Sequence, residues 1–556
     1  MKRAILIVGL LVPVCVSAQS ILGKVTNNKG EPLIGASVYW RGSTVGTTTG
    51  VRGDFELSAE GVNDLRLVAS FVGHTSDTMS VSNETFLEIT LNESVELSEV
   101  VVRDERDGVA ISSLKPIKVE QISSVELAKA ACCDLAGCFE TQTTVQPQTT
   151  NVITNAKELR ILGLSGVYNQ VLIDGFPVIQ GLTQTYGISG IPGTLVDNIY
   201  ISKGANSVLQ GYESISGQIN VETIEPDKTD QLLLNAYMNQ FLEKQVNANF
   251  AVKQDKWSNL TAFHMVQPAK KFDRDKDGFL DLPLLTRYLV YNKWKYGKDR
   301  DWGWNSRIAV GYMNEKRVGG QIDFNEDTDK GSSEVYGQTV SIDQPSVWTK
   351  TGYRVNDEHN VVLHASAYYQ NQHSYFGTVK YEAQQTAVYA NLQHEFIYKA
   401  HMLKTGISYR HFNLIEDVSF TDTTVDRTYD GAYQRLENIP GAFAENTMKF
   451  FDNTLTWIAG VRGDYHNQFG FMVTPRTLLK YDVWPKTIVR ASFGTGWRTV
   501  NLFSENVGLL VSSRDIVFQE QLQPERAMNF GANVTQKFET KDQNLSGYFS
   551  ADYYRT

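Results

Sequence analysis

The chain has 556 residues, a formal net charge of −10 and a pI of about 5.5. Its acidity argues against nucleic acid as a partner, and its length predicts two or three structural units rather than one domain. The mean hydropathy of −0.28 argues against helical membrane spans, but it is compatible with membrane-spanning strands, in which only every second residue meets lipid.

The N-terminus has the features of a secretory signal peptide over residues 1–18. Lys2 and Arg3 precede a short apolar run, and Val16-Ser17-Ala18 supplies small residues for cleavage after Ala18. The alternative is an uncleaved anchor, but a run of about fifteen residues spans a bilayer poorly. Later segments lack the long apolar run of a transmembrane helix, so we expect an exported protein.

Residues 19–93 have the pattern of a small β-sandwich. Apolar and polar residues alternate around Val38 and Trp40 and again around Phe55 and Leu57, and turn-forming residues lie at 28–30 and 51–53. Short antiparallel strands in such a segment pack best as two sheets face to face. One histidine, no cysteine and no clustered carboxylates accompany them, so the segment predicts no catalytic site.

Residues 94–108 form a linker that contains an extended β-branched run, Val95–Val102, before the charged stretch 103–107. The run has two interpretations. It is either the last strand of the sandwich or a free edge that pairs with a strand of another protein by β-augmentation.

The next segment, 109–226, begins with helix-compatible spacing over Val119–Ala131. Three cysteines follow closely, namely Cys132, Cys133 and Cys138. In an exported protein they can form one disulfide, Cys133–Cys138 or Cys132–Cys138, or bind a soft metal such as Cu(I), or remain as thiols.

Residues 159–223 contain short β-rich runs with glycines at each change of direction. The runs are Leu159–Leu162, Val171–Ile173, Ile199–Ile201 and Gln218–Thr223. Because glycine permits positive φ and a close backbone approach, this pattern predicts a compact αβ unit. The alternative is a soluble αβ domain with glycine-rich turns, which does not explain the flanking sequence.

The same stretch resembles the plug of TonB-dependent outer-membrane receptors. The resemblance lies in four pieces that occur in the family's order: RILG at 160–163, VLIDGFP at 171–177, ISKG at 201–204, and residues 207–211 leading into GQIN at 217–220. The sandwich likewise resembles the carboxypeptidase-regulatory-like domain that precedes the plug in many Bacteroidetes receptors, and the linker resembles the TonB-box region. The resemblance implies that TonB, with its inner-membrane energising complex, pairs with Glu96, Leu97, Ser98, Glu99, Val100, Val101 and Val102.

Residues 227–556 carry amphipathic strands, such as Val246–Val252, Leu455–Val461 and Met528–Val534. Period-two alternation with a polar opposite face predicts either a soluble sandwich or a barrel whose outer face meets lipid. Eight of the nine tryptophans lie at or beyond Trp257, which favours a barrel with aromatic interface belts. We therefore expect a mainly β protein of the Gram-negative outer membrane, with a small N-terminal β-sandwich, an αβ plug domain and a transmembrane antiparallel β-barrel.

The barrel is expected to be incomplete at the C-terminus. Plugged transporters of this type have about 22 strands, whereas residues 227–556 have room for about 14. An unclosed sheet in lipid leaves unsatisfied edges, so we expect the sequence to be a fragment of a longer receptor.

A candidate calcium loop lies at residues 273–281. Asp273, Asp275, Asp277 and Asp281 occupy positions 1, 3, 5 and 9 of a Ca²⁺-binding loop around the turn at Gly278, and Phe279 is at position 7. Leu284 replaces the usual glutamate at position 12. The alternative is a solvated acidic loop.

The family resemblance implies active import: cargo binds outside, the TonB segment is released inward, and pulling partly remodels the plug. Sequence motifs of hydrolases, P-loop proteins and zinc proteases are missing, so we expect no enzyme. A ferric siderophore or related metal chelate is the leading cargo. Cobalamin, haem or a copper chelate are alternatives, as is a non-transporting signalling or adhesion receptor.

Two groups of residues are candidates for cargo contact. Gln184 and Tyr186 are expected at the apex of the plug, where they can reach a ligand. Tyr369 and His373, with the neighbouring Tyr368 and Tyr375, are expected in a loop of the barrel. A packing or membrane-interface role is the alternative for each tyrosine.

Overall fold

The computed structural model describes residues 20–92, 119–122, 127, 134–140 and 142–556, with gaps at 44, 60, 61, 63, 72, 73, 75, 82–85, 205, 298–301, 423, 425, 485, 513 and 540–545. The predicted signal peptide, the linker 94–108 with its coupling segment, Cys132 and Cys133 lie outside these residues. The chain divides into two compact units, Met1–Glu105 and Arg106–Thr556. Helices long and apolar enough to span a membrane are absent from the described residues.

The first unit is the predicted β-sandwich. One sheet has the order β4-β1-β7 and the other β3-β2-β5-β6. Buried and exposed side chains alternate along β1, β4 and β7 because successive residues of a strand point to opposite faces. Trp40 lies at the centre of the shared core and donates its indole N–H to the Ser58 carbonyl over 2.9 Å. The strands are β1 (Ser20–Asn27), β2 (Ser37–Trp40), β3 (Gly46–Thr48), β4 (Asp54–Ser58), β5 (Arg66–Ser70), β6 (Asp77–Ser80) and β7 (Phe86–Leu91).

In the second unit, a plug is formed by a four-stranded sheet of order β11-β13-β12-β8 and a hairpin of β9 and β10. An apolar core that runs from Ile122 to Val221 holds these elements together. The strands are β8 (Val119–Ile122), β9 (Val145–Asn151), β10 (Ala156–Ile161), β11 (Asn169–Ile173), β12 (Val196–Lys203) and β13 (Gly217–Thr223). The helical turns are η2 (Gly137–Phe139), η3 (Gly166–Tyr168), α2 (Thr183–Tyr186) and η4 (Gly193–Leu195).

The four β-rich runs predicted in the plug are confirmed as parts of β10, β11, β12 and β13, except that Leu162 lies in the turn after β10. The helix predicted over Val119–Ala131 is wrong for its first four residues, which form β8 and pair with the edge of β12. A helix of one turn is unstable on its own, so the hydrogen bonds offered by a sheet edge decide the conformation of this short segment.

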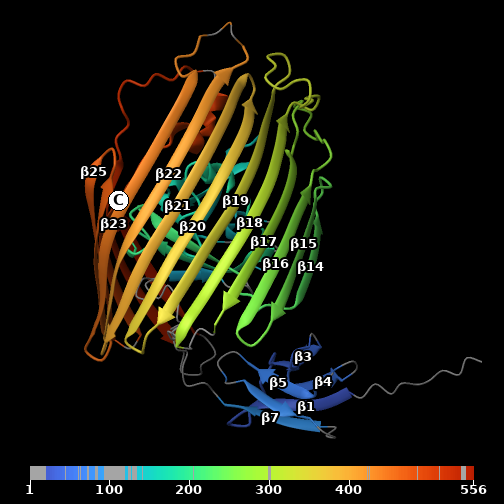
Figure 1. The fold of residues 1–556 in the computed structure, drawn as a ribbon. Coiled ribbons are helices and arrows are strands. Elements are labelled where there is room, and N and C mark those ends of the chain that lie inside the picture. Colours follow the sequence, from blue (N-terminus) through green and yellow to red (C-terminus); the bar gives the residue numbers. More distant parts are fainter. Residues whose placement is uncertain are drawn as a thin grey trace, which may run out of the picture. The chain divides into compact units, whose positions relative to one another are not determined.

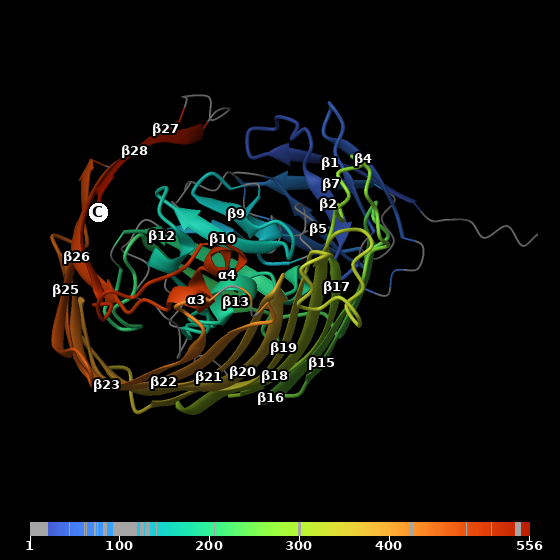
Figure 2. The ribbon, with the colours of Figure 1, turned by 90° about the horizontal axis from the view of Figure 1, so that it is seen from above.

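The rest of the second unit is a single sheet of fifteen antiparallel strands that curves around the plug (Figures 1 and 2). The strands are β14 (Leu232–Met238), β15 (Lys244–Lys253), β16 (Trp257–Gln267), β17 (Leu284–Tyr296), β18 (Gly303–Gly320), β19 (Gly337–Arg354), β20 (His359–Phe376), β21 (Val379–Tyr398), β22 (His401–Phe420), β23 (Gly431–Phe450), β24 (Leu455–His466), β25 (Gly470–Trp484), β26 (Thr487–Arg498), β27 (Glu525–Glu539) and β28 (Ser546–Arg555). We call this sheet the wall; β14 and β28 are its two edges.

The wall is apolar outside and polar inside, which confirms the predicted barrel-type pattern. Along β15, Val246, Phe250 and Val252 are exposed on the outer face, while the intervening Asn247 and Asn249 are buried toward the plug. The same pattern of exposed apolar and buried polar side chains recurs along β24 and β27. A water-soluble sandwich requires the opposite arrangement, with its apolar face buried.

The two rims of the wall differ in their connections. At one rim the strands are joined by short turns, such as residues 254–256 and 399–400, and at the other by long loops, such as 268–283, 321–336 and 499–524. Outer-membrane barrels have short periplasmic turns and long external loops. We therefore call the rim with the long loops the outer rim.

Because the two units are separate compact bodies, a core mutation in the first should leave the second intact. Trp40→Ala should lower the free energy of unfolding of the sandwich by about 3–5 kcal/mol. Calorimetry of the whole chain should show the sandwich transition move to lower temperature while the plug–wall transition stays in place. Val51→Ala, at an exposed turn of the same unit, is the matched control and should move neither. A shift of both transitions in Trp40→Ala would contradict this division.

Candidate functional site

Buried charges join the plug to the wall where the chain leaves the plug. The ammonium of Lys293, on β17, lies 2.7 Å from Glu225 Oε1 and 3.7 Å from Asp174 Oδ1, and it donates to the Thr223 carbonyl. Arg307, on β18, contacts the second oxygen of Glu225 at 2.9 Å. Burial alone would raise the pKa of Glu225, but these cations hold it well below its usual value.

A second attachment joins Arg476 and Glu445 of the wall to the plug. Arg476, on β25, donates to the carbonyls of Ser207 and Tyr212 over 2.8 and 3.0 Å. Glu445, on β23, accepts from the Ser207 hydroxyl over 2.8 Å and from the Val208 N–H over 3.1 Å. The wall thus supplies partners of both signs to a plug segment without secondary structure, whose backbone groups would otherwise be buried unpaired.

Arg317 forms a third attachment, near the plug apex. It donates to the carbonyls of Thr154 and Asn155 over 2.9 and 3.0 Å and to the Ser189 hydroxyl over 2.7 Å. Its guanidinium lies 4.8 Å above the ring of Tyr186. Glu315 neutralises the cation and fixes its position on β18.

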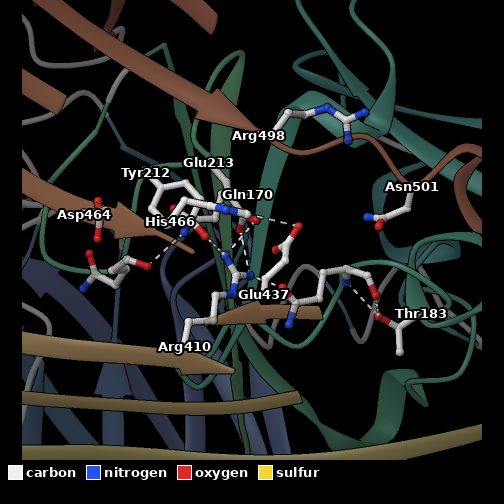
Figure 3. A network of polar contacts seen from close by, with 12 residues as sticks. Gln170, Thr183, Tyr212, Glu213, Arg410, Glu437, Asp464, His466, Arg498 and Asn501 are labelled. Atoms are coloured by element: carbon white, nitrogen blue, oxygen red, sulfur yellow. Dashed lines mark hydrogen bonds and ion pairs between the residues drawn. The ribbon is translucent and has the colours of Figure 1, made fainter. Parts of the chain in front are cut away.

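A polar cavity lies between the plug and the wall. Figure 3 shows the network of polar contacts to which several of its lining residues belong. The cavity's volume of about 40 Å³ has room for roughly three water molecules. The plug contributes Gln170, Gln180, Gln184 and Glu213, the wall contributes Phe412, Glu437 and Arg498, and the loop between β26 and β27 contributes Thr499, Asn501 and Glu505. The lining therefore combines side chains from three separate parts of the fold.

The charges around this cavity are largely paired. Arg410, on β22, contacts Glu213 at 2.8 Å and donates to the Tyr212 hydroxyl and the Gln180 carboxamide. Arg498 contacts Glu505 at 2.9 Å and Glu525 at 2.7 Å. Burial raises the pKa of Glu505 to about 7 against the opposing effect of Arg498. The Glu437 carboxylate is held less closely, with Oε1 3.6 Å from both Arg435 and His466.

The two residues predicted at the plug apex lie in α2, and both are buried. Gln184 lines the polar cavity. Tyr186 is packed under Arg317, and its hydroxyl lies 3.1 Å from that of Thr154. A ligand can reach Gln184 only after a rearrangement, and Tyr186 is further from the cavity.

The loop predicted to carry Tyr369 and His373 is not present, and that prediction is wrong. Both residues lie within β20, which continues to Phe376 and is joined to β21 by two residues. Their side chains are on the outer face, where His373 lies 3.3 Å from Glu382. Tyr368 points inward and accepts from the Gln385 carboxamide over 2.8 Å. The alternation that began at Val361 simply continues, because period two persists through the polar end of a long strand.

The predicted calcium loop brings three carboxylates together. Ligand atoms of Asp273, Asp275 and Asp281 lie within 4.8 Å of one another at the outer rim. Asp277 instead accepts the Phe279 N–H over 2.7 Å, and Asp273 accepts the N–H of Gly278 over 3.0 Å. Hard oxygen ligands around a tight loop suit Ca²⁺, so the donor set fits this ion in part.

Among the predicted cysteines, Cys138 is buried in η2, and its thiol lies 3.4 Å from the Asp134 carbonyl. The disulfide and metal interpretations both depend on Cys132 and Cys133, and they stay predictions.

The wall cations were not predicted from the sequence. They could have been found from the alternation of inward- and outward-facing residues along each strand. Arg462 follows the outward-facing Val461 in β24. Arg476 lies on the face of β25 opposite the outward-facing Val473 and Leu479. A charge on the polar face of such a strand must face the lumen.

Three family models match the chain. They are the CarboxypepD_reg-like domain over residues 21–102, the TonB-dependent receptor plug domain over 113–218, and the TonB-dependent receptor-like β-barrel over 256–556. The first match includes the whole run Glu96–Val102, which keeps open whether this run is a strand of the sandwich or a coupling segment.

The chain is also similar to individual proteins. It is 30% identical over 219 residues to TonB-dependent receptor P26 of Formosa agariphila and 26% identical over 243 residues to TonB-dependent receptor SusC of Bacteroides thetaiotaomicron. These matches cover 37% and 39% of the chain but only 21% and 22% of those proteins. The fold is similar to that of the ferric yersiniabactin uptake receptor FyuA of Yersinia pestis (TM-score 0.59, 13% identity, 79% of this chain and 72% of that one). It is similar to the copper transporter OprC as well (TM-score 0.60, 13% identity, 81% and 72%).

Removal of a wall cation should loosen the plug. Lys293→Leu leaves Asp174 and Glu225 with fewer partners, and an uncompensated buried charge costs about 3–5 kcal/mol. We expect faster hydrogen–deuterium exchange in β11 and β13 and unchanged exchange in the sandwich. Lys253→Leu, at the exposed end of β15, is the matched control. Equal exchange in Lys293→Leu and the parent would show that this ion pair does not hold the plug.

Proposed function

The chain belongs to the TonB-dependent receptor family of outer-membrane proteins, and from this premise we propose that it imports a scarce, bulky nutrient by TonB-driven movement of the plug. The proposed cargo is a ferric siderophore or a related metal chelate. The proposed partner is TonB with its inner-membrane energising complex, bound through Glu96–Val102.

The observation that carries this proposal is the plug itself. It lies inside the wall and is joined to it by the ion pairs of Lys293 and Arg410 and by the hydrogen bonds of Arg317 and Arg476. A passage for a bulky solute requires these contacts to break, so the receptor needs an external source of work. A periplasmic partner that binds the segment before β8 can pull on it. Because β8 is an edge strand of the plug sheet, the force then acts directly on this edge.

The cargo class rests on the proteins of similar fold, which include a ferric yersiniabactin receptor and a copper transporter. The polar lumen supports it, because a hydrophilic chelate needs hydrogen-bonding groups along its route. Cobalamin and haem should be tested as alternative cargoes.

The test is proton-gradient-dependent uptake by cells that express this receptor. Ferric siderophores, haem, cobalamin and copper chelates should be compared as labelled cargo, and a ferric siderophore should accumulate. Val101→Pro removes a backbone N–H that a β-augmented pair requires. It should abolish uptake and leave cargo binding and surface abundance unchanged.

Val51→Pro, in an exposed turn of the sandwich, is the control substitution. Accumulation that persists in Val101→Pro would refute the assigned coupling segment, and accumulation that survives collapse of the proton gradient would refute active import. Binding without any accumulation would instead indicate a signalling or adhesion receptor.

We further propose that the loop at 273–281 binds a structural Ca²⁺. The convergence of Asp273, Asp275 and Asp281 supports it, and extracellular calcium modules bind with a Kd of about 10⁻⁴–10⁻³ M. Millimolar Ca²⁺ should slow proteolysis of this loop in the parent, and Asp273→Asn with Asp281→Asn should remove the effect. Asp452→Asn, at the opposite rim, should retain it; equal protection in all three proteins would exclude the site.

A further inference from the structure

The loop between β26 and β27 folds into the lumen above the plug. Its segment Asn501–Val511, which we call the inner loop, contains α3 (Leu502–Glu505) and α4 (Val507–Val511). Figure 2 shows both helices inside the curve of the wall, over the plug strands. Phe503 and Leu510 are fully buried in the same apolar cluster as Leu182 and Tyr186 of the plug. The Thr185 hydroxyl donates to the Ser504 carbonyl over 2.7 Å.

The inner loop covers the polar cavity as well as α2. Asn501 and Glu505 form part of its lining, opposite Gln184. Glu505 is tied to Arg498 on the wall, and beyond α4 the Asp515 carboxylate accepts from the Thr428 N–H over 2.9 Å. Polar contacts that water can replace therefore hold Glu505 within the inner loop and Asp515 just beyond it.

Two side chains in the cavity lack the partners that burial demands. Gln184 Nε2 and Asn501 Oδ1 make no hydrogen bond, although the two residues are only 8% and 7% exposed. Glu437 Oε1 also makes no hydrogen bond, and it lies 3.6 Å from both Arg435 and His466. Buried polar groups are normally satisfied, so this cavity is organised to receive a polar group from elsewhere.

The unpaired atoms define the chemistry of that group. Gln184 Nε2 is a donor and needs an acceptor, whereas Asn501 Oδ1 and Glu437 Oε1 are acceptors and need donors. A hydroxyl both donates and accepts. A carboxylate or phosphate only accepts. It would face the carboxylates of Glu213, Glu437 and Glu505, and the nearby cations Arg410 and Arg498 are already paired with Glu213 and Glu505. The volume of about 40 Å³ admits a small group rather than a whole chelate.

We propose that this cavity is a subsite for a neutral, hydroxyl-bearing group of the cargo, and that the inner loop must leave the lumen before the cargo can reach it. The identification of this ligand as cargo rests on the proposed import function. The closure itself does not, because it follows from the position of Asn501–Val511 over Gln184.

Closure is tested without any cargo by the reactivity of a cysteine at position 184. In Gln184→Cys, external 2-hydroxyethyl methanethiosulfonate should react slowly. Addition of Phe503→Ala, which removes a buried anchor of the inner loop, should raise the rate at least tenfold. Val152→Cys, at an exposed plug turn, should react fast with and without Phe503→Ala, and the parent chain gives the background. A rate at position 184 that Phe503→Ala does not change would overturn the closure.

The chemical preference is tested with the same variants. In Gln184→Cys with Phe503→Ala, the hydroxyethyl reagent should react at least tenfold faster than the anionic 2-sulfonatoethyl reagent, after both rates are divided by those at Val152→Cys. A normalised ratio near one would overturn the preference for a neutral hydroxyl. The control at position 152 also shows whether Phe503→Ala has disturbed the plug.

The need for opening during import is tested with Thr185→Cys and Ser504→Cys together. The oxidised, cross-linked receptor should lose uptake of whichever chelate of the panel the parent accumulates, and reduction should restore it. Each single variant under the same oxidant is a control. If the cross-linked receptor takes up as much chelate as the parent, the need for the inner loop to open is refuted, but the import function is not. If the parent accumulates no chelate, the import function is refuted, but the cysteine-reactivity test of closure remains valid.

Discussion

A charged side chain on the lumenal face of the wall has to be neutralised where it lies, because the plug has displaced the water that would otherwise solvate it. The cost of burying an isolated charge is far larger than the gain from a well-made pair. The attachments of Lys293, Arg317, Arg410 and Arg476 follow from this constraint. Each faces acidic side chains or backbone carbonyls of the plug, and the plug is fixed wherever such a pair forms.

The same constraint explains how a firmly seated plug can be released. The plug keeps an apolar core of its own, from Ile122 to Val221, and meets the wall both through polar groups and through apolar clusters, such as that of Phe176 with Trp348. An ion pair that separates into water loses little free energy, since solvation replaces the lost partner. The apolar clusters that join plug and wall resist separation in proportion to the apolar area exposed. The polar contacts therefore fix the position of the plug and can be hydrated once they open, whereas separation of the apolar contacts needs external work.

Sequence reasoning could predict the architecture because that depends on local patterns. Alternation along segments such as Val246–Val252 gave strands with the correct face outward, and the glycine-punctuated runs became β10 to β13. It could not predict contacts between distant segments. The burial of Gln184 depends on a loop more than 300 residues later that folds inward, and β8 is a strand only because β12 offers an edge. The predicted loop position of His373 is wrong because the polar residues around it continue the period-two pattern of β20.

The most direct measurement of the central claim is a disulfide between plug and wall in living cells. A Cβ placed at Gly460, on β24, would lie 2.9 Å from a Val208 methyl of the plug, so Val208→Cys and Gly460→Cys should cross-link. The account predicts rapid cross-linking and a loss of uptake that reduction reverses. Failure to cross-link in a correctly inserted receptor, or full uptake with the bond intact, would contradict a plug that is held in the wall and has to move.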